Sequence, residues 1–453
     1  MHGICQDLPR DERLDGVLSR LDPADMLAVL RAQLSDVAPE VRDRWRKIVA
    51  LDAAYHPARY VRIAFALLSD PDTPGNRVWP EGDLVYLHAP VRRPMSRRGQ
   101  VIRVGEDDVE VYRFPNDRRL RGLRKFASAT SAPERWQHWI ERNGRAEVLD
   151  AATLQRRFIR YTPEYKWIIR LRAEVRDPAT GEIAKRRIAV RCASPASCRG
   201  LARRHAVASR VLSRISDDVR VPQVLGWEAD AGLLAVEWDR GDPLLEALKS
   251  DDRAIEAFAH ALRWLHGAQI PGLPTLASER VGESIAAAVK ELAVVCPELA
   301  GIVTEMANDL CRGLGDLEPV HPVTLHNDLH LHQVLAKRGR FTFLDLERMS
   351  LGDPLIDIAN FAAQLSILPH RRDFAVEPER AARWRARFLA SLFEQTGEVF
   401  DDPRFHWFAA AAFLRHAHGA MRHLRPGWRD TVQTCVRLAE SELTGRRGRA
   451  GVR

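Results

Sequence analysis

The stretch LHNDLHLHQVLAKRGRFTFLDLERMSLGDPLIDIANF, residues 325–361, decides the fold of the chain. It opens with a His-x-Asp turn, continues through a short β-rich run, turns on Lys-Arg-Gly-Arg, and returns through a second β-rich run that ends at Asp345. A two-stranded ribbon of this length brings its two ends together. The sequence therefore predicts that Asp328 and Gln333 face Asp345 across the ribbon.

These three side chains are the types that a phosphoryl-transfer site needs. Such sites work by positioning and charge neutralisation rather than by covalent chemistry. A carboxylate must lie where the acceptor hydroxyl enters, and oxygen ligands must hold Mg²⁺ between the phosphates. We expect Asp328 to take the first role, and Gln333 and Asp345 to hold the Mg²⁺.

The segment resembles the aminoglycoside phosphotransferase and choline kinase family, whose fold is similar to that of protein kinases. The family's His-x-Asp loop, with an Asn five residues after the Asp, corresponds to His326, Asp328 and Gln333. Its metal-binding Asp corresponds to Asp345, and Asp357 in GDPLIDIANF matches an Asp that braces the catalytic loop. The resemblance implies a catalytic Asp328, a His326 that orients the loop, Mg²⁺ as cofactor, and ATP or GTP as co-substrate.

The resemblance extends over about residues 155–440. EWDRGDPL is similar to the hinge between the two lobes of the family fold, which implies that Glu237, Trp238 and Asp239 lie against the nucleotide base. AHALRWLHGAQIPGL is similar to the helix beyond the hinge. The fold implied is α+β and bilobal, with a small antiparallel β-sheet lobe and a larger helical lobe.

The chain departs from the family pattern around the phosphates. The strand Lys that holds the α/β-phosphates is replaced by Arg191, and His205 stands near the place of its Glu partner. Because Arg has a longer, planar head that binds two oxygens at once, the phosphate grip is either shifted or lost, and Lys185 is a candidate replacement. Gln333 still offers Mg²⁺ a carbonyl oxygen. The turn RYTPEYKW has no glycine, so a phosphate cover would rely on side chains such as Lys166.

Length and patterning predict an extra module before the kinase-like part. The 453 residues exceed the roughly 250–300 that one core reaches. We expect a helical plus small-sheet module over residues 1–150, an N-lobe over 151–240, a helical C-lobe over 241–445, and a disordered basic tail over 446–453. No recognisable chemistry falls in residues 1–150.

Periodicity predicts the elements of these parts. Helical spacing favours helices in LDGVLSRL, ADMLAVLRAQL and YVRIAFALL of residues 1–70, and alternation favours strands in LVYLHAPV, GQVIRV and DVEVYRF. A helix is expected over 130–150. RRFIRY, KWIIRLRAEV and RRIAVRC predict antiparallel strands, followed by a helix in SCRGLARRHAVASRVLSRI and two more strands before the hinge.

Composition predicts a soluble, cytoplasmic protein without a membrane span. The chain is 45% hydrophobic and 29% charged, and no apolar run approaches the ~18 residues that cross a bilayer. The opening residues MHGICQDLPRDERLDG carry acids where a secretory signal has a basic end and an apolar stretch. The six cysteines lack the C-x-x-C pairs of structural zinc sites.

The positive charge lies in the first half of the chain. Residues 1–240 hold 43 Lys and Arg against 33 Asp and Glu, residues 241–453 hold 26 against 28, and the whole chain has a net charge of +8. An anionic partner of the N-terminal module and a basic surface that aids solubility both explain this excess. The basic run 92–125 favours the wet face of a half-buried sheet over a nucleic-acid interface, because stacking aromatics are sparse in it.

The sequence predicts an enzyme that phosphorylates a hydroxyl of a small molecule, such as a sugar, polyol or amino alcohol, with ATP or GTP. One rival is a catalytically weakened pseudokinase that binds or scaffolds, given Arg191, His205 and Gln333. A second is an enzyme of the same fold that transfers AMP. Because the helical half is only two charges negative, polycationic aminoglycosides are not the first expected acceptor.

The cluster HNDLHLH allows a further alternative, a zinc or iron site for hydrolysis. That site would use His326, Asp328, His330 and His332. It leaves Asp345 and the ribbon unexplained, so we favour His330 and His332 in the acceptor cleft or facing solvent.

Overall fold

A computed structural model of the protein describes residues 8–72, 82–89, 99–127, 131–315, 317, 320–371, 374–393 and 402–450. The chain forms two compact units. Unit 1 comprises Met1–Arg203, Gln223–Trp238 and Arg422–Pro426, and unit 2 comprises Arg204–Pro222, Asp239–Met421 and Gly427–Arg453. The boundary between Trp238 and Asp239 therefore falls inside the predicted hinge.

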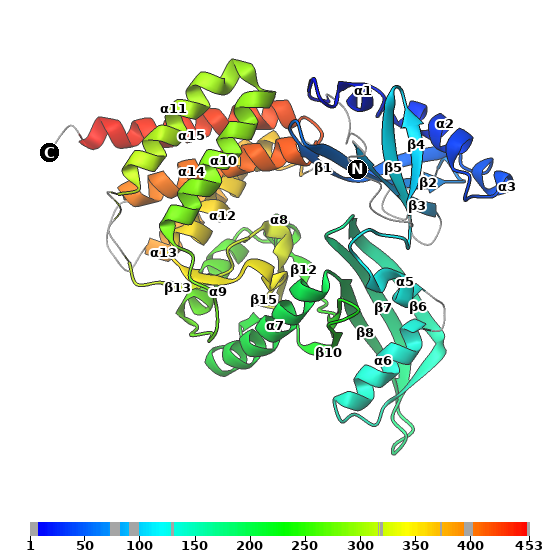
Figure 1. Ribbon diagram of the computed structural model, residues 1–453. Helices are drawn as coiled ribbons and strands as arrows, with labels where there is room; N and C mark the ends of the chain where they lie inside the picture. The colour runs from blue at the N-terminus through cyan, green and yellow to red at the C-terminus, as the bar shows by residue number, and fades with distance from the viewer. Residues whose placement is uncertain are drawn as a thin grey trace. The chain divides into compact units, whose positions relative to one another are not determined.

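Unit 1 holds two five-stranded antiparallel sheets (Figure 1). Its elements are α1 (Asp15–Leu18), α2 (Pro23–Gln33), α3 (Pro39–Arg42), β1 (Lys47–His56), β2 (Tyr60–Leu68), β3 (Gly82–Ala89), β4 (Gln100–Val104), β5 (Asp107–Arg113), α5 (Gly122–Ala127), α6 (Ser131–Arg142), β6 (Val148–Thr162), β7 (Lys166–Arg176), β8 (Ile183–Cys192), β10 (Val224–Glu228) and β11 (Leu233–Glu237). Helix α7 (Pro195–Ile215) begins in unit 1 and ends in unit 2.

The first sheet has the strand order β1-β2-β3-β5-β4, with α2 in contact with β1 and β4. β3, β4 and β5 confirm the predicted strands. The prediction of a helix in YVRIAFALL was wrong, because these residues form β2. From Ile63 to Leu68 every residue is buried, so both faces of the strand are apolar and the alternation that identifies a half-buried strand is missing. β4 instead alternates between exposed and buried positions, as a sheet with one wet face does.

The second sheet has the order β10-β11-β8-β7-β6, which confirms the predicted antiparallel five-stranded lobe. β7 shows why it forms. Trp167, Ile169, Leu171, Ala173 and Val175 are buried, whereas the residues between them are only partly covered. One face of the strand therefore packs into a core and the other carries charged side chains.

Both sheets of unit 1 contribute to one hydrophobic core. Its buried residues come mainly from β1, β2, β3 and β5 of the first sheet, from β6, β7, β8 and β11 of the second, and from α5 and α6. Tyr86 and Tyr112 stack with ring centroids 4.8 Å apart, and Trp167 packs edge-on against Phe126. The N-terminal sheet is thus packed directly against the lobe that the family pattern predicts.

Unit 2 is mostly helical, with two small sheets ordered β12-β14-β15-β9 and β13-β16. Its elements are β9 (Val219–Arg220), β12 (Asp242–Pro243), α8 (Leu244–Ser250), α9 (Ala254–Gly267), α10 (Ser278–Val295), η1 (Pro297–Leu299), α11 (Ala300–Gly313), β13 (Val323–Leu325), η2 (Leu331–Gln333), β14 (Val334–Lys337), β15 (Arg340–Phe343), η3 (Leu346–Arg348), β16 (Ser350–Gly352), α12 (Leu355–Ile367), η4 (Leu368–His370), α13 (Pro378–Phe393), α14 (Pro403–Arg422) and α15 (Trp428–Ala450).

Helix α12 lies in the core of unit 2, since all but one of its residues are buried. Phe361 of α12 packs against Phe258 of α9 and Phe388 of α13, with ring centroids 4.7 and 4.8 Å away. The α+β class with antiparallel sheets and a helical second part is confirmed. Within the described residues, no helix has the length and apolar character needed to cross a membrane.

The shared core of unit 1 predicts that Gly122 cannot accept a side chain. A Cβ at Gly122, the first residue of α5, would lie 1.9 Å from the backbone oxygen of Ala231. Because a backbone atom cannot move aside cheaply, we expect Gly122→Ala to lower the free energy of urea unfolding by about 1–3 kcal/mol. Gly419→Ala is the control, since a Cβ there meets nothing within 4 Å in the interior of α14 and should stabilise by about 0.5–1 kcal/mol. Equal effects of the two variants would contradict this packing.

Candidate active site

The β14–β15 ribbon brings the predicted metal ligands to one end. Val334 pairs with Phe343, and the backbone N–H of Leu344 donates to the backbone oxygen of Gln333 over 2.7 Å. Asp345 follows directly, in a left-handed conformation with φ of 58°. Apart from glycine, Asn and Asp adopt this conformation most readily, and here it lies between β15 and η3 at the position that the sequence assigns to the metal.

Asp357 fixes the backbone of the His-x-Asp loop. Its carboxylate is 1% exposed and accepts the N–H of His326 over 2.7 Å and the N–H of Asn327 over 2.8 Å. His266 of α9 approaches the same carboxylate at 3.3 Å. Asn327 is left-handed, with φ of 58°, so Asp357 stabilises a strained turn immediately before Asp328.

His326 links this loop to the ribbon. Its ring is fully buried, and Nε2 donates to the backbone oxygen of Leu344 over 2.7 Å. Because a carbonyl only accepts, this contact assigns the ring proton to Nε2. His326 therefore holds the loop next to the residue that precedes Asp345.

The carboxylate of Asp328 is held from two sides. Oδ1 lies 3.2 Å from Nε2 of His330, and Oδ2 accepts the amide N–H of Gln333 over 3.1 Å. Burial by itself would raise the pKa of Asp328. The hydrogen bond and charge of His330, the charge of Arg348 and the bond from Gln333 outweigh burial and hold the pKa well below its usual value. Asp328 is thus a carboxylate at neutral pH.

Gln333 fits a role as a magnesium ligand. Its amide nitrogen is used by Asp328, whereas its oxygen Oε1 is buried and has no hydrogen-bond partner among the described residues. A buried polar atom without a partner is destabilising, so such an oxygen suits a bound cation. Amide and carboxylate oxygens are the ligands that Mg²⁺ prefers, and Asp345 supplies the carboxylate across the ribbon.

The structure lends no support to the alternative zinc or iron site. No group of three or more His, Cys, Asp or Glu side chains in the described part of the chain is arranged to hold a metal ion. His332 is exposed and packs against Phe374 with the rings tilted and their centroids 5.2 Å apart. His330 contacts Asp328 instead and lies 6.3 Å from the ring of His416.

Sequence reasoning missed two arginines that act on the loop. Arg348 of η3 contributes positive charge near Asp328. Burial is the main cause of the lowered pKa of Arg415 in α14. The charge of Arg348 lowers this pKa further, whereas the charges of Asp328 and Asp357 raise it. Arg348 lies within the stretch 325–361, three residues after Asp345, but the sequence analysis gave it no role, whereas Arg415 is distant in sequence and approaches the loop through tertiary packing.

The predicted phosphate-binding residues lie in β8 of unit 1. Arg191 is 8% exposed and pairs across the sheet with Ile168 of β7 and Leu234 of β11. The structure does not bring Lys185 to it, which corrects that hypothesis. Lys185 pairs with Glu174 at 3.7 Å and lies six residues, or about 20 Å, from Arg191 along the strand. A lysine side chain cannot span that length.

The predicted hinge residues have different surroundings. Glu237 ends β11, and its N–H donates to the oxygen of Gln223 over 2.9 Å. Trp238 stacks with Arg170, whose guanidinium carbon lies 5.2 Å from the ring centroid. In unit 2, the carboxylate of Asp239 accepts the hydroxyl of Thr342 of β15 over 2.5 Å, which ties the hinge exit to the ribbon.

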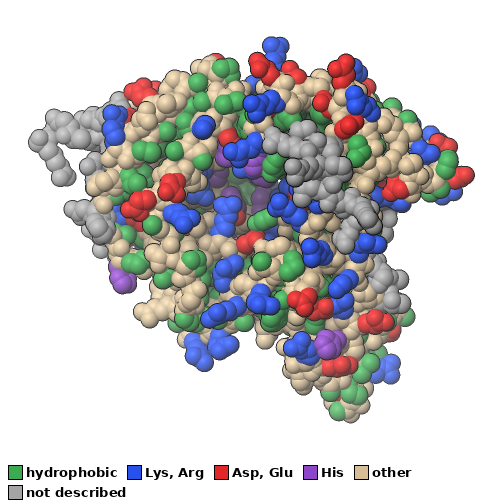
Figure 2. Space-filling model, viewed as in Figure 1, with side chains coloured by type: hydrophobic (Ala, Val, Ile, Leu, Met, Phe, Trp, Pro, Cys, Tyr) green, Lys and Arg blue, Asp and Glu red, His purple; other side chains and the backbone are tan. Residues whose placement is uncertain are grey.

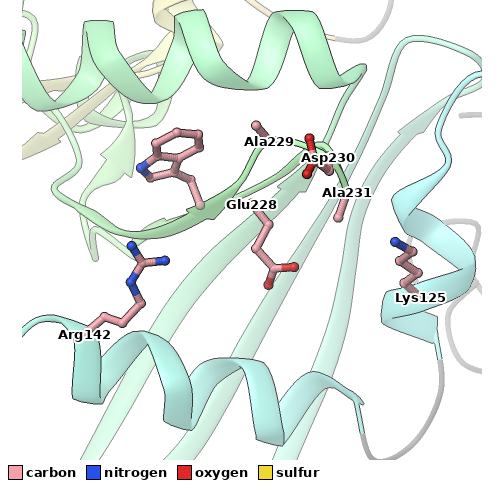
Figure 3. Close-up of a pocket in the computed structure, with 7 residues that line it drawn as sticks. Lys125, Arg142, Glu228, Ala229, Asp230 and Ala231 are labelled. Carbon is pink, nitrogen blue, oxygen red and sulfur yellow. The ribbon is translucent and has the colours of Figure 1, made fainter.

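Unit 1 also contains a cavity that involves none of the predicted site residues. It has a volume of about 470 Å³ and lies between α5, α6 and the β10–β11 turn, as Figure 3 shows. Its lining residues are Lys125, Arg142, Trp227, Glu228, Ala229, Asp230 and Ala231. Charges of both signs line it, and on the molecular face in Figure 2 Lys and Arg are likewise interspersed with Asp and Glu. Residues 92–98 of the basic run lie outside the described residues.

Residues 170–408 match the sequence profile of the phosphotransferase enzyme family, known as APH, and they make up more than half of the chain. The chain belongs to the phosphotransferase enzyme family. This assignment confirms the resemblance drawn from the catalytic loop and, with it, the protein-kinase-like fold. It also establishes the phosphotransferase class of the protein. No match was found among curated proteins.

Several solved structures are similar to this phosphotransferase at low sequence identity. A choline/ethanolamine kinase family protein from Mesorhizobium loti has 16% identity and a TM-score of 0.44, with 61% of this chain and 89% of that chain covered. Choline kinase from Cryptosporidium parvum has 13% identity and a TM-score of 0.45, with 65% and 90% covered. Aminoglycoside phosphotransferase APH(4)-Ia has 15% identity and a TM-score of 0.46, with 70% and 99% covered. The family assignment rests on residues 170–408 and not on these distant likenesses.

The surroundings of Asp328 predict a stability that depends on pH. Because its folded pKa lies below the unfolded value of about 3.9, the carboxylate stabilises the folded state at neutral pH, and this contribution is lost as the pH falls below about 4. We expect Asp328→Asn to be less stable than the parent at pH 7, and the difference in urea unfolding to shrink below pH 4. Asp108→Asn breaks an exposed pair with Arg103 and should show little difference at any pH. A difference in unfolding free energy between the parent and Asp328→Asn that stays constant with pH would count against the lowered pKa of Asp328.

Proposed function

We propose that this phosphotransferase moves the terminal phosphoryl group of ATP or GTP to a hydroxyl group of a small molecule such as a sugar, polyol or amino alcohol. The pairing of Asp328 with Gln333 carries the proposal. The Gln333 amide nitrogen holds the carboxylate, while the amide oxygen stays buried and without a partner among the described residues. Gln333 thereby joins two functions: its amide nitrogen binds Asp328, which would receive the acceptor proton, and its amide oxygen would bind the metal.

In the proposed mechanism, Asp328 orients the acceptor hydroxyl and receives its proton. The hydroxyl oxygen forms a bond to the terminal phosphorus as the bond from that phosphorus to the nucleoside diphosphate breaks. The low pKa keeps Asp328 ionised before the reaction, and His330 and Gln333 fix the direction of its oxygens. Asp357 and His326 keep the loop backbone in place during the step.

The remaining residues bind and position the nucleotide. Asp345 and Gln333 would hold Mg²⁺, which neutralises charge on the phosphates when it is bound. Arg191 takes the place of the strand lysine and would grip phosphate oxygens with its planar guanidinium. Glu237, Trp238 and Asp239 would border the base. The family fold, the buried amide oxygen and the ionised Asp328 together support this arrangement over a scaffold that has lost catalysis.

Replacement of Asp328 tests its role in the reaction. Since a positioned base contributes about 10²–10⁴-fold to a rate, Asp328→Asn should lower turnover by that factor. Turnover is measured as ADP or GDP release in a screen of hydroxylated metabolites, and intact-mass analysis of the product separates phosphate transfer from AMP transfer. Asp309→Asn, in α11, is a control that should retain the parent rate. Near-parent turnover of Asp328→Asn would remove Asp328 from the mechanism.

Nucleotide binding separates the enzyme from a scaffold independently of the acceptor. Mg-ATP at 100 times its Kd should raise the free energy of unfolding by about 2.7 kcal/mol, because only the folded state binds it. Asp345→Asn should lose most of this increase, whereas Asp309→Asn should keep it. Thermal or urea unfolding with and without Mg-ATP or Mg-GTP provides the measurement. If neither nucleotide changes the stability of the parent protein, the pseudokinase alternative is favoured.

A further inference from the structure

The turn between β6 and β7 is held by the N-terminal sheet. Thr162 pairs with Lys166 and leaves a three-residue loop, Pro163 to Tyr165. Glu164 is left-handed in this loop, with φ of 62°, a position that usually takes glycine. A charged residue persists in such a conformation only where its surroundings determine it.

The Glu164 carboxylate lies in a cluster of basic side chains from the first 120 residues. It is 3% exposed and lies 3.3 Å from Nδ1 of His88, 3.4 Å from Nε of Arg118, 3.5 Å from Nε of Arg119 and 3.6 Å from a terminal nitrogen of Arg62. Burial by itself would raise the pKa of Glu164, but His88 and the arginines hold it below its usual value. The carboxylate is therefore ionised and bound by β2, β3 and the segment after β5.

Asp117 holds the backbone of the same turn. Its carboxylate is 1% exposed, and one oxygen accepts the N–H of Glu164 and the hydroxyl of Tyr161, each over 2.9 Å. Its other oxygen accepts the N–H groups of Arg119 and Leu120 over 2.7 and 2.8 Å. Asp117 thus joins the segment after β5 to both sides of the turn, and the turn cannot move without breaking buried hydrogen bonds.

This turn stands beside the phosphate-binding position. Arg191 pairs with Ile168, two residues from the closing pair of the turn, which corresponds to about 7 Å along β7. Lys166, Ile168 and Arg191 share one face of the sheet, since paired and alternate residues of a strand point the same way. In protein kinases the loop next to the strand lysine covers the nucleotide phosphates.

We propose that the β1–β5 sheet is a positioning module for the nucleotide, which holds the β6–β7 turn over the ATP phosphates through Glu164 and Asp117. This inference rests on the proposed function. It gives residues 1–150 a role and explains the missing glycine, because ion pairs to the module supply the order that a flexible glycine-rich turn lacks. Glu164 and Asp117 are positioning residues, since they act on the turn and not on the reacting atoms.

The test compares nucleotides with and without phosphates. Glu164→Gln removes the charge that binds the turn, so the covering conformation is populated less and the apparent Kd of Mg-ATP should rise about tenfold. Adenosine, which makes no phosphate contact, should bind as to the parent. Hydrogen exchange of a peptide spanning residues 158–168 should become faster. Arg118→Gln removes the partner from the module side and should act in the same direction, which keeps the test valid if Glu164→Gln folds poorly.

Asp83→Asn is the matched control. It breaks contacts of Asp83 with Arg113 of the same sheet and with Trp45 just before β1, away from the turn, so it should lower the melting temperature without changing the Kd of Mg-ATP. Equal Mg-ATP affinity of the parent and of both turn variants, or equal weakening of Mg-ATP and adenosine, would overturn the positioning role. A parent protein that binds no Mg-ATP would instead overturn the proposed function itself, and this inference with it.

Discussion

The candidate active site depends on the hydrogen bonds that the carboxylate of Asp357 accepts. The carboxylate accepts two consecutive backbone N–H groups, from His326 and Asn327, and the second of these residues is left-handed. Asn adopts the left-handed conformation more readily than most residues with a side chain, and the two hydrogen bonds to Asp357 hold this loop in it. Helix α12 provides a rigid support for Asp357 because it is buried along almost its whole length. The direction of Asp328 is therefore set by the core of unit 2.

Unit 1 uses the same device at the β6–β7 turn. Asp117, like Asp357, is 1% exposed and accepts the N–H of a left-handed residue that is not glycine, here Glu164. In both places a buried carboxylate replaces the conformational freedom of glycine with hydrogen bonds to the backbone. Of the seven left-handed residues other than glycine in the described part of the chain, Asn327 lies in the loop that carries Asp328 and Glu164 lies in the turn beside Arg191, and a buried carboxylate binds the backbone of each.

The sequence predicted the parts of the site that local spacing determines. The ribbon, its turn and the place of Asp345 follow from residues close together in the chain, and the alternation in β7 marks a half-buried strand. β2 was mispredicted as a helix because burial on both faces removes that alternation. The bond from Glu164 to Asp117 joins residues 47 apart, and no periodic pattern records such a contact. Lys185 failed as a substitute for Arg191 because the two lie on one strand, where the separation is fixed by the rise per residue.

If the β6–β7 turn covers the phosphates as proposed, its lack of glycine has a thermodynamic consequence for nucleotide binding. A glycine-rich turn loses backbone entropy when it closes over phosphates, and that loss reduces affinity. A turn already held by Glu164 and Asp117 loses less on binding, because its conformation is fixed in the folded protein. Arg191 in the neighbouring strand β8 is also restrained before binding, because the residue is buried and only 8% exposed. In the proposed nucleotide site, an arginine with a planar head in place of lysine and an anchored turn in place of a mobile one are consistent with each other, since both would favour a site that is ordered before the nucleotide binds.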